Sequence, residues 1–223
     1  ASRARAIDFG IDKAVSLNFY FCDNKKVISE LKIDSLDIKG AILSGNFILK
    51  AKVLKDNGLT GKLYSSNVTI NSSALPDLKI FFKLTKDKLE VYSLNFGNAY
   101  RLKGTVRLKE QFETNIYFEI IRANLKDIAT IIKAKRPDVV TGVINGLFNI
   151  KGPLNTLQSS GFIGGRSGKI GPIWYDSADI RIQGIGPIIN IVDSRIKQAQ
   201  ATFTMEGYID LRNIVGSDLL SYI

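Results

Sequence analysis

Residues 45–53 of the chain read GNFILKAKV, in which apolar residues occupy every second position from Phe47 to Val53. Successive side chains of a β-strand point to opposite faces of a sheet, so this pattern predicts a strand with one buried and one solvated face. The apolar face would carry Phe47, Leu49, Ala51 and Val53, and the polar face Lys50 and Lys52.

The same period of two recurs along the whole chain. Further alternating runs occupy residues 15–21, 89–96, 114–120, 144–150, 178–183 and 201–205. Glycine, asparagine and proline clusters separate the runs, as expected for turns between antiparallel strands. The sequence therefore predicts a mainly β chain of a dozen or more strands.

Two segments have helical features. Asn124 is suited to an N-cap, Leu125, Ile128 and either Ile131 or Ile132 follow at helical spacing, and Pro137 ends the pattern. A terminal helical turn is predicted over residues 213–222. Neither segment could cover a parallel sheet, so the predicted fold contains one or two short helices beside its strands.

Glycine recurs just before predicted strands of similar sequence. This motif occurs at residues 43–49, 102–108 and 205–211, and a doubled version lies at residues 141–152. A glycine at a strand entrance permits a bulge or bend. Periodic bends predict that the antiparallel sheet curls into an elongated, U-shaped trough. Ordinary turn glycines of a β-sandwich are the alternative interpretation.

Residues 102–211 resemble the AsmA/TamB-like superfamily of bacterial envelope proteins. The similarity lies in LKGTV at 102–106, GLFNIKGP at 146–153, SGFIG at 160–164, DIRI at 179–182 and GYIDL at 207–211. The resemblance implies a twisted, open β-sheet in the periplasm, with an apolar inner surface that handles phospholipid between the inner and outer membranes. It also implies an inner-membrane anchor outside this sequence.

We expect one β-trough domain over residues 1–223, as part of a longer protein. The composition shifts near Pro137, from strands rich in lysine, leucine and phenylalanine to strands rich in glycine and isoleucine. Neither part offers a closed core of its own, so the shift is not interpreted as a boundary between domains.

The composition argues against an enzyme. The chain has no histidine and a single cysteine, Cys22, which excludes Ser-His and Cys-His catalysis, an intrachain disulfide and a multi-thiolate zinc site. No catalytic residue, metal or cofactor is predicted. The carboxylates Asp34 with Asp37, and Asp176 with Asp179, are interpreted as solvated surface residues.

The chain is strongly basic. It has 31 Lys and Arg against 21 Asp and Glu, a formal net charge of +10. Most cations are single residues on strand faces without a stacking pattern of aromatic rings, which disfavours nucleic acid as a partner. Anionic lipid head groups at a membrane surface fit such a face better.

The predicted binding surface is the row of alternate apolar residues along the trough. Burying an acyl chain there would contribute about 0.8 kcal/mol per CH₂. The predicted lipid-binding residues are Phe47, Leu49, Val53, Tyr92, Leu94, Phe96, Val106, Leu108, Ile116, Phe118, Phe148, Ile150, Ile180, Ile182, Phe203, Ile209 and Leu211.

A second functional hypothesis uses the strand edges in place of the apolar face. Exposed edges can pair with a strand of another protein. The chain would then be a structural or assembly scaffold for a partner such as an outer-membrane protein. Co-purified phospholipid would favour lipid binding over this alternative.

Overall fold

A computed structural model describes residues 15–22, 26–38, 41–55, 58–70, 73–108, 113–131, 140–153 and 156–210. By contacts between residues the chain divides into two compact units. The first unit comprises Ala1–Asn98 and Lys103–Leu108, and the second comprises Ala99–Leu102 and Lys109–Ile223.

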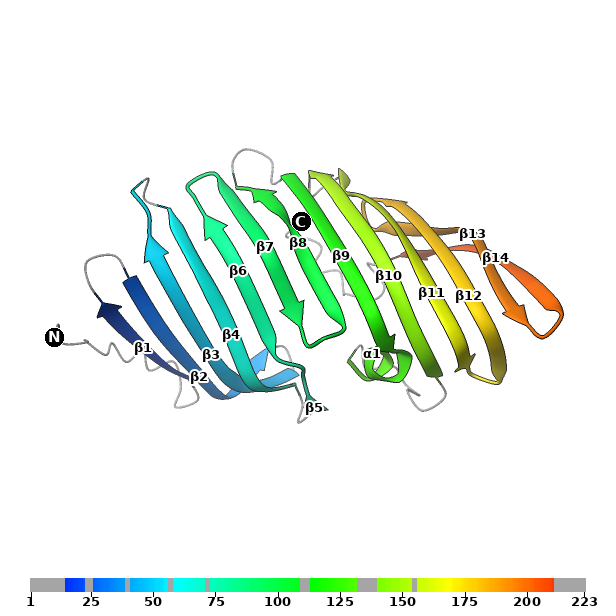
Figure 1. The fold of residues 1–223 in the computed structure, drawn as a ribbon, viewed down its shortest axis with the longest axis horizontal. Coiled ribbons are helices and arrows are strands. Elements are labelled where there is room, and N and C mark those ends of the chain that lie inside the picture. Colours follow the sequence, from blue (N-terminus) through cyan, green and yellow to red (C-terminus); the bar gives the residue numbers. More distant parts are fainter. Residues whose placement is uncertain are drawn as a thin grey trace. The chain divides into compact units, whose positions relative to one another are not determined.

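The first unit is an antiparallel sheet whose strands follow the order β1-β2-β3-β4-β6-β7 (Figure 1). The short strand β5 pairs with β4, and β8 (Tyr100–Arg107) contributes residues to both units. The bounds are β1 Val15–Cys22, β2 Lys26–Ile38, β3 Ala41–Val53, β4 Leu59–Ile70, β5 Ser73–Ala74, β6 Leu78–Leu84 and β7 Lys88–Phe96.

The second unit is also antiparallel, and its strands follow chain order from β9 to β14 (Figure 1). The bounds are β9 Glu113–Asn124, α1 Leu125–Ile131, β10 Val140–Pro153, β11 Gln158–Ile170, β12 Ile173–Ile185, β13 Ile188–Gln198 and β14 Ala201–Asp210. The predicted mainly β, antiparallel fold class with a short helix is thus confirmed.

The helix α1 begins where the sequence predicts it. Asn124 is its N-cap, since the Asn124 Oδ1 atom accepts a 2.9 Å hydrogen bond from the Lys126 backbone N–H. Leu125 and Ile128 contact a core cluster formed by Ile120, Ala123 and Ile144. The predicted end of the helix at Pro137 and the predicted turn over residues 213–222 lie outside the described residues.

Two of the predicted glycine bends, at Gly45 and Gly142, occur at β-bulges, and the extra residue lies on the neighbouring strand. Gly45 of β3 faces the bulged pair Asn67 and Val68 of β4. A Cβ atom on Gly45 would lie 2.9 Å from Val68 Cγ2, so the Val68 side chain requires glycine there. Gly142 of β10 faces a similar bulge in β11.

Bulges of the second unit lie on alternate strands. The residues Arg122 of β9, Ser167 of β11 and Asp193 of β13 have φ of 48°, 49° and 43°, and each lies at a register shift. A residue in this left-handed conformation is typical of a G1-type bulge.

Side-chain hydroxyl and amide groups satisfy the backbone at these bulges. Arg122 N–H donates a 2.9 Å hydrogen bond to Asn145 Oδ1. The Ser194 hydroxyl, 1% exposed, accepts from Arg181 N–H at 3.0 Å and donates to the Val192 carbonyl at 3.0 Å. Buried polar groups of this kind cost stability unless they are hydrogen-bonded, and here they are.

The Tyr175 side chain of β12 packs against glycines of β10 and β11. Its ring is 4% exposed and lies over glycines. A Cβ atom on Gly142 would lie 2.6 Å from the Tyr175 hydroxyl, and one on Gly168 would collide with the same group. The absence of Cβ atoms at these glycines therefore makes room for the aromatic side chain.

Candidate lipid-binding surface

Cross-strand pairing brings apolar side chains of the first unit onto one face. Residues directly opposite each other in neighbouring strands share a face. One row runs Ser29–Leu49–Leu63–Ile80–Leu94 across β2, β3, β4, β6 and β7. We call this side the apolar face of the first unit.

Five of the predicted lipid-binding residues lie on this face. They are Phe47, Leu49, Val53, Leu94 and Phe96. Val53 is 38% exposed, and the other four are half-buried.

Two further predicted residues lie in the segment Lys103–Leu108, which includes the end of β8 and belongs to the first unit. Val106 and Leu108 are half-buried. The Leu108 backbone N–H donates a 2.9 Å hydrogen bond to the Asp87 carbonyl, which ties this segment to the turn before β7.

Tyr92 lies on the opposite face, which corrects the sequence-based assignment. Phe82 pairs with Val91, whereas Phe81 pairs with Ser93, so a register shift intervenes at this point of β7. The Tyr92 ring contacts Phe81, with centroids 5.1 Å apart, and it is 47% exposed. A one-residue shift reverses the face of the following side chain, and alternation alone does not reveal it.

The second unit has an apolar face of the same kind. One row runs Phe118–Phe148–Gly161–Ile182–Ile191 across β9 to β13. The next runs Ile116–Ile150–Ser159–Gly184–Ile189. Aromatic rings continue across it, since Tyr100 stacks on Phe118 at 6.3 Å and Phe118 contacts Phe148 at 5.7 Å.

Most of the remaining predicted residues share this second apolar face. Phe203 pairs with Ile196 and is 51% exposed, and the Ile209 backbone pairs with Ile189. Leu211 lies outside the described residues. The others on this face are Ile116, Phe118, Phe148, Ile150, Ile180 and Ile182, all half-buried.

Most large side chains on each apolar face are half-buried over the ranges that the structure describes. Helix α1 packs at the end of the second unit's face near Ile144. Within the described ranges, the buried hydrophobic residues are few: Ile33, Ala51, Val68, Ile120, Ala123, Ile144, Tyr175 and Ala178. The large apolar side chains between them remain partly accessible.

Sequence reasoning missed a second set of apolar residues on the other face of the second unit. Leu147 pairs with Phe162, and these side chains are 44% and 39% exposed. The signal was present, because Leu147 precedes Phe148 and Phe162 precedes Ile163, and adjacent apolar residues serve both faces of a strand. Phe148 was assigned to the predicted lipid-binding surface, whereas Leu147, Phe162 and Ile163 were assigned to none.

The same face of the second unit also has a shallow polar depression of about 540 Å³. Four of its side chains form one cross-strand row, Asn149–Ser160–Gln183–Asn190. The Asn149 Oδ1 atom is buried without a hydrogen-bond partner. This face of the second unit therefore carries both the polar row and the exposed side chains of Leu147 and Phe162.

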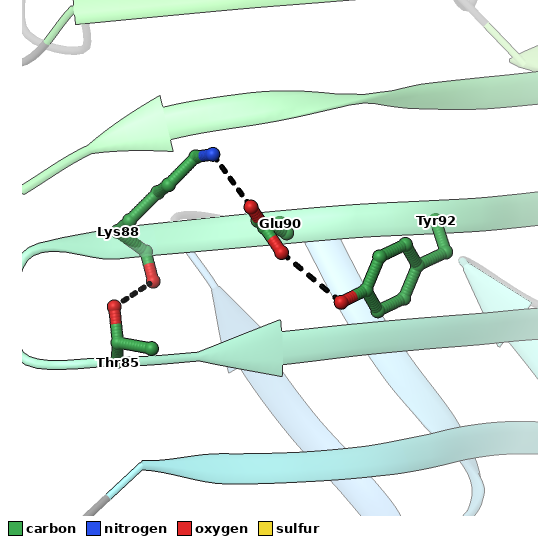
Figure 2. A network of polar contacts seen from close by, with 4 residues as sticks. All are labelled: Thr85, Lys88, Glu90 and Tyr92. Carbon is green, nitrogen blue, oxygen red and sulfur yellow. Dashed lines mark hydrogen bonds and ion pairs between the residues drawn. The ribbon is translucent and has the colours of Figure 1, made fainter. Parts of the chain in front are cut away.

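A polar network marks the other face of the first unit (Figure 2). The Lys88 Nζ atom lies 2.5 Å from Glu90 Oε1, and the Tyr92 hydroxyl donates a 3.0 Å hydrogen bond to Glu90 Oε2. These contacts lower the pKa of Glu90, chiefly through Lys88, and the hydrogen bond to Glu90 raises the pKa of Tyr92. Thr85 completes the network by donating a 3.2 Å hydrogen bond to the Lys88 carbonyl.

Over the ranges that the structure describes, no group of three or more acidic or thiol side chains gathers where it could hold a metal ion. No helix in these same ranges has the length and apolar character to cross a bilayer. No family model matches the chain, and no curated protein or solved structure is significantly similar to it.

Proposed function

We propose that this chain is a non-enzymatic lipid-binding domain of the bacterial cell envelope. In this proposal the apolar face of each unit holds phospholipid acyl chains during transfer between the inner and outer membranes in the periplasm. The resemblance of residues 102–211 to AsmA/TamB-like proteins supports the setting.

One observation carries the proposal: large apolar side chains line up across neighbouring strands on one face and remain partly accessible. The face of the second unit presents Phe118, Phe148 and Ile182 in one continuous row. Contiguous apolar surfaces that remain accessible mark sites of interaction with apolar ligands or partners. An acyl chain is apolar, flexible and narrow, so it can follow such a row across neighbouring strands.

The free energy available is sufficient for a lipid tail. About 0.8 kcal/mol per buried CH₂ gives on the order of 10 kcal/mol for a dozen methylene groups, before the cost of ordering the chain. No catalytic group is required for this step.

Native mass spectrometry of the purified chain tests the proposal. We expect co-purified phospholipid on the unmodified protein. The variant I180Q/I182Q places two amides on the apolar face of the second unit and should reduce the bound lipid. The matched control L147Q/F162Q makes an equal change on the opposite face and should leave the bound lipid unchanged.

Circular dichroism would first establish that both variants fold. Absence of phospholipid from the unmodified protein would contradict the proposal. Equal loss of lipid from the two variants would also contradict it, because binding would then not depend on the apolar face.

A structural or assembly role is the second candidate, and the edge strand β14 favours it. Among the described strands, β14 pairs only with β13. Its side chains are mostly exposed, including Tyr208 at 72%. An outer-membrane protein could add a strand at this edge. A purified chain without phospholipid that forms a stable complex with such a protein would favour this role.

A further inference from the structure

Lysine side chains cover the face of the first unit that lies opposite its apolar face. The pairing of strands places six of them there, and we call this set the basic face. It comprises Lys26 of β2, Lys50 and Lys52 of β3, Lys62 of β4, and Lys79 and Lys83 of β6. Five of the six are exposed, and Lys83 is half-buried.

Two pairs of these lysines stand directly opposite each other. Lys26 pairs with Lys52, and Lys50 pairs with Lys62. Opposed side chains of neighbouring strands have Cβ atoms about 5 Å apart, and like charges at that separation destabilise a sheet. The arrangement costs the folded chain stability, so it calls for an explanation other than folding.

The six lysines have no carboxylate within ion-pair distance among the residues that the structure describes. Lys32 and Lys88 on the same side do have one, at 2.7 Å from Asp34 and 2.5 Å from Glu90. Lys83 stands directly opposite Glu90 of β7. The other five lysines present a positive charge across β2, β3, β4 and β6 without a carboxylate directly opposite them.

Exposed aromatic rings lie among the lysines. Phe81 is 39% exposed, and Tyr92 contacts it on the same side. The Lys62 Nζ atom lies 5.7 Å from the centre of the Phe81 ring. Amphipathic aromatic side chains beside lysines are typical of surfaces that rest at the head-group level of a bilayer.

Every cation between residues 6 and 100 is lysine, without a single arginine. Arginine is the preferred residue where phosphates or bases are recognised by paired, directional hydrogen bonds. Lysine acts as a point charge on a flexible stem, which suits a diffuse layer of negative charge. The two-dimensional spread over β2, β3, β4 and β6 also fits a lipid surface better than a single nucleic-acid strand.

We propose that the basic face of the first unit docks on the surface of a bilayer that contains anionic phospholipid. The contact is with head groups, on the face opposite the one that would hold acyl chains. It therefore goes beyond the proposed function and does not depend on it. The lysines hold the chain at the membrane while Phe81 and Tyr92 reach the interface.

Co-sedimentation with lipid vesicles tests this docking. We compare vesicles of phosphatidylcholine alone with vesicles of phosphatidylcholine and phosphatidylglycerol. We expect binding to the anionic vesicles only, weakening as salt is raised. Each lysine strengthens such binding about fivefold, so the variant K26Q/K50Q/K52Q/K62Q should lose on the order of several hundred-fold in affinity.

The control K126Q/K151Q/K169Q/K197Q removes the same charge from the second unit and should bind anionic vesicles far more tightly than the first variant. An equal loss in both variants would overturn the proposal, because net charge alone would then explain binding. Displacement of the protein from vesicles by an equal charge concentration of single-stranded oligonucleotide would overturn it in favour of nucleic acid. Unchanged phospholipid in the native mass spectrum of K26Q/K50Q/K52Q/K62Q would separate this docking from acyl-chain binding.

Discussion

Gly161 has no room for a side chain. A Cβ atom there would collide with the Phe148 ring and would lie 2.8 Å from the Leu147 carbonyl oxygen. The Phe148 ring occupies the place that a side chain on β11 would otherwise take on the apolar face. The large ring and the neighbouring glycine thus form a complementary pair across two strands.

We expect Gly161→Ala to lower the free energy of unfolding by about 1–3 kcal/mol, as overpacking does. Urea denaturation followed by circular dichroism would measure it. Gly207→Ala is the matched control, because nothing lies within 4 Å of a Cβ atom there. The control should change stability by no more than about 0.5 kcal/mol. Equal effects at both positions would contradict the packing argument.

Burial of the Tyr175 phenol predicts how the free energy of unfolding depends on pH. Burial raises the pKa of Tyr175. The folded state therefore holds the proton more tightly than the unfolded state, whose tyrosine pKa is about 10. The free energy of unfolding should be constant below that pH and fall as pH rises through the raised pKa.

Tyr175→Phe removes the ionisable group but keeps the ring over the glycines. Urea midpoints at pH values on either side of 10 should show a smaller fall for this variant than for the unmodified chain. Identical pH profiles for Tyr175→Phe and the unmodified chain would show that burial does not raise the pKa of Tyr175.

The stability of helix α1 depends on the capping side chain of Asn124. It has seven residues, too few to be stable alone, so its cap and its packing on the core cluster hold it in place. Asn124→Ala should cost about 0.5–2 kcal/mol of stability. Asn124→Asp, which keeps the capping oxygen, should recover most of it. Comparison of their urea midpoints checks the cap, and equal losses would argue against it.

At the scale of the elements, alternation predicted strands well because one-sided burial imposes a period of two. It placed Phe47 and Leu49, or Phe148 and Ile150, correctly on a common face. It failed at Tyr92, because a bulge moves the next side chain to the other face without a glycine to signal it. Bulge positions depend on which strands pair, and a single strand's sequence does not state its partner's register.

Glycine gave partial information about the bulges. Gly45 and Gly142 do lie at register shifts, yet the extra residues are Asn67 and Ser167 on the next strand. The need for glycine arises from a side chain across the strand pair, Val68 in one case and Tyr175 in the other. Such a requirement is visible only after the strands are paired.

At the scale of the whole molecule, the charge of +10 should oppose folding through self-repulsion. We expect the thermal unfolding temperature to rise when salt is added, since about 0.1 M salt screens charges beyond roughly 10 Å. The variant K26Q/K50Q/K52Q/K62Q should unfold at a higher temperature in low salt and respond less to added salt. A melting temperature that does not depend on salt in the unmodified chain would contradict this expectation.

The two units and the basic face were beyond the sequence-based interpretation for a common reason. The lysines were recognised as single residues on strand faces, but their concentration on one side required the registers of β2, β3, β4 and β6. Likewise, the division near β8 follows from contacts between distant residues, whereas the composition shifts near Pro137. Local composition and long-range contact are different quantities.

The opposed lysines also bear on how copies of this protein behave toward one another. Sheets that stack face to face approach within about 10 Å, which is the spacing found in fibrils. Two copies that approached through Lys26, Lys50 and their neighbours would repel each other before their backbones came that close. Concentrated solutions should consequently stay clear until a soluble polyanion is added, at which point turbidity should develop.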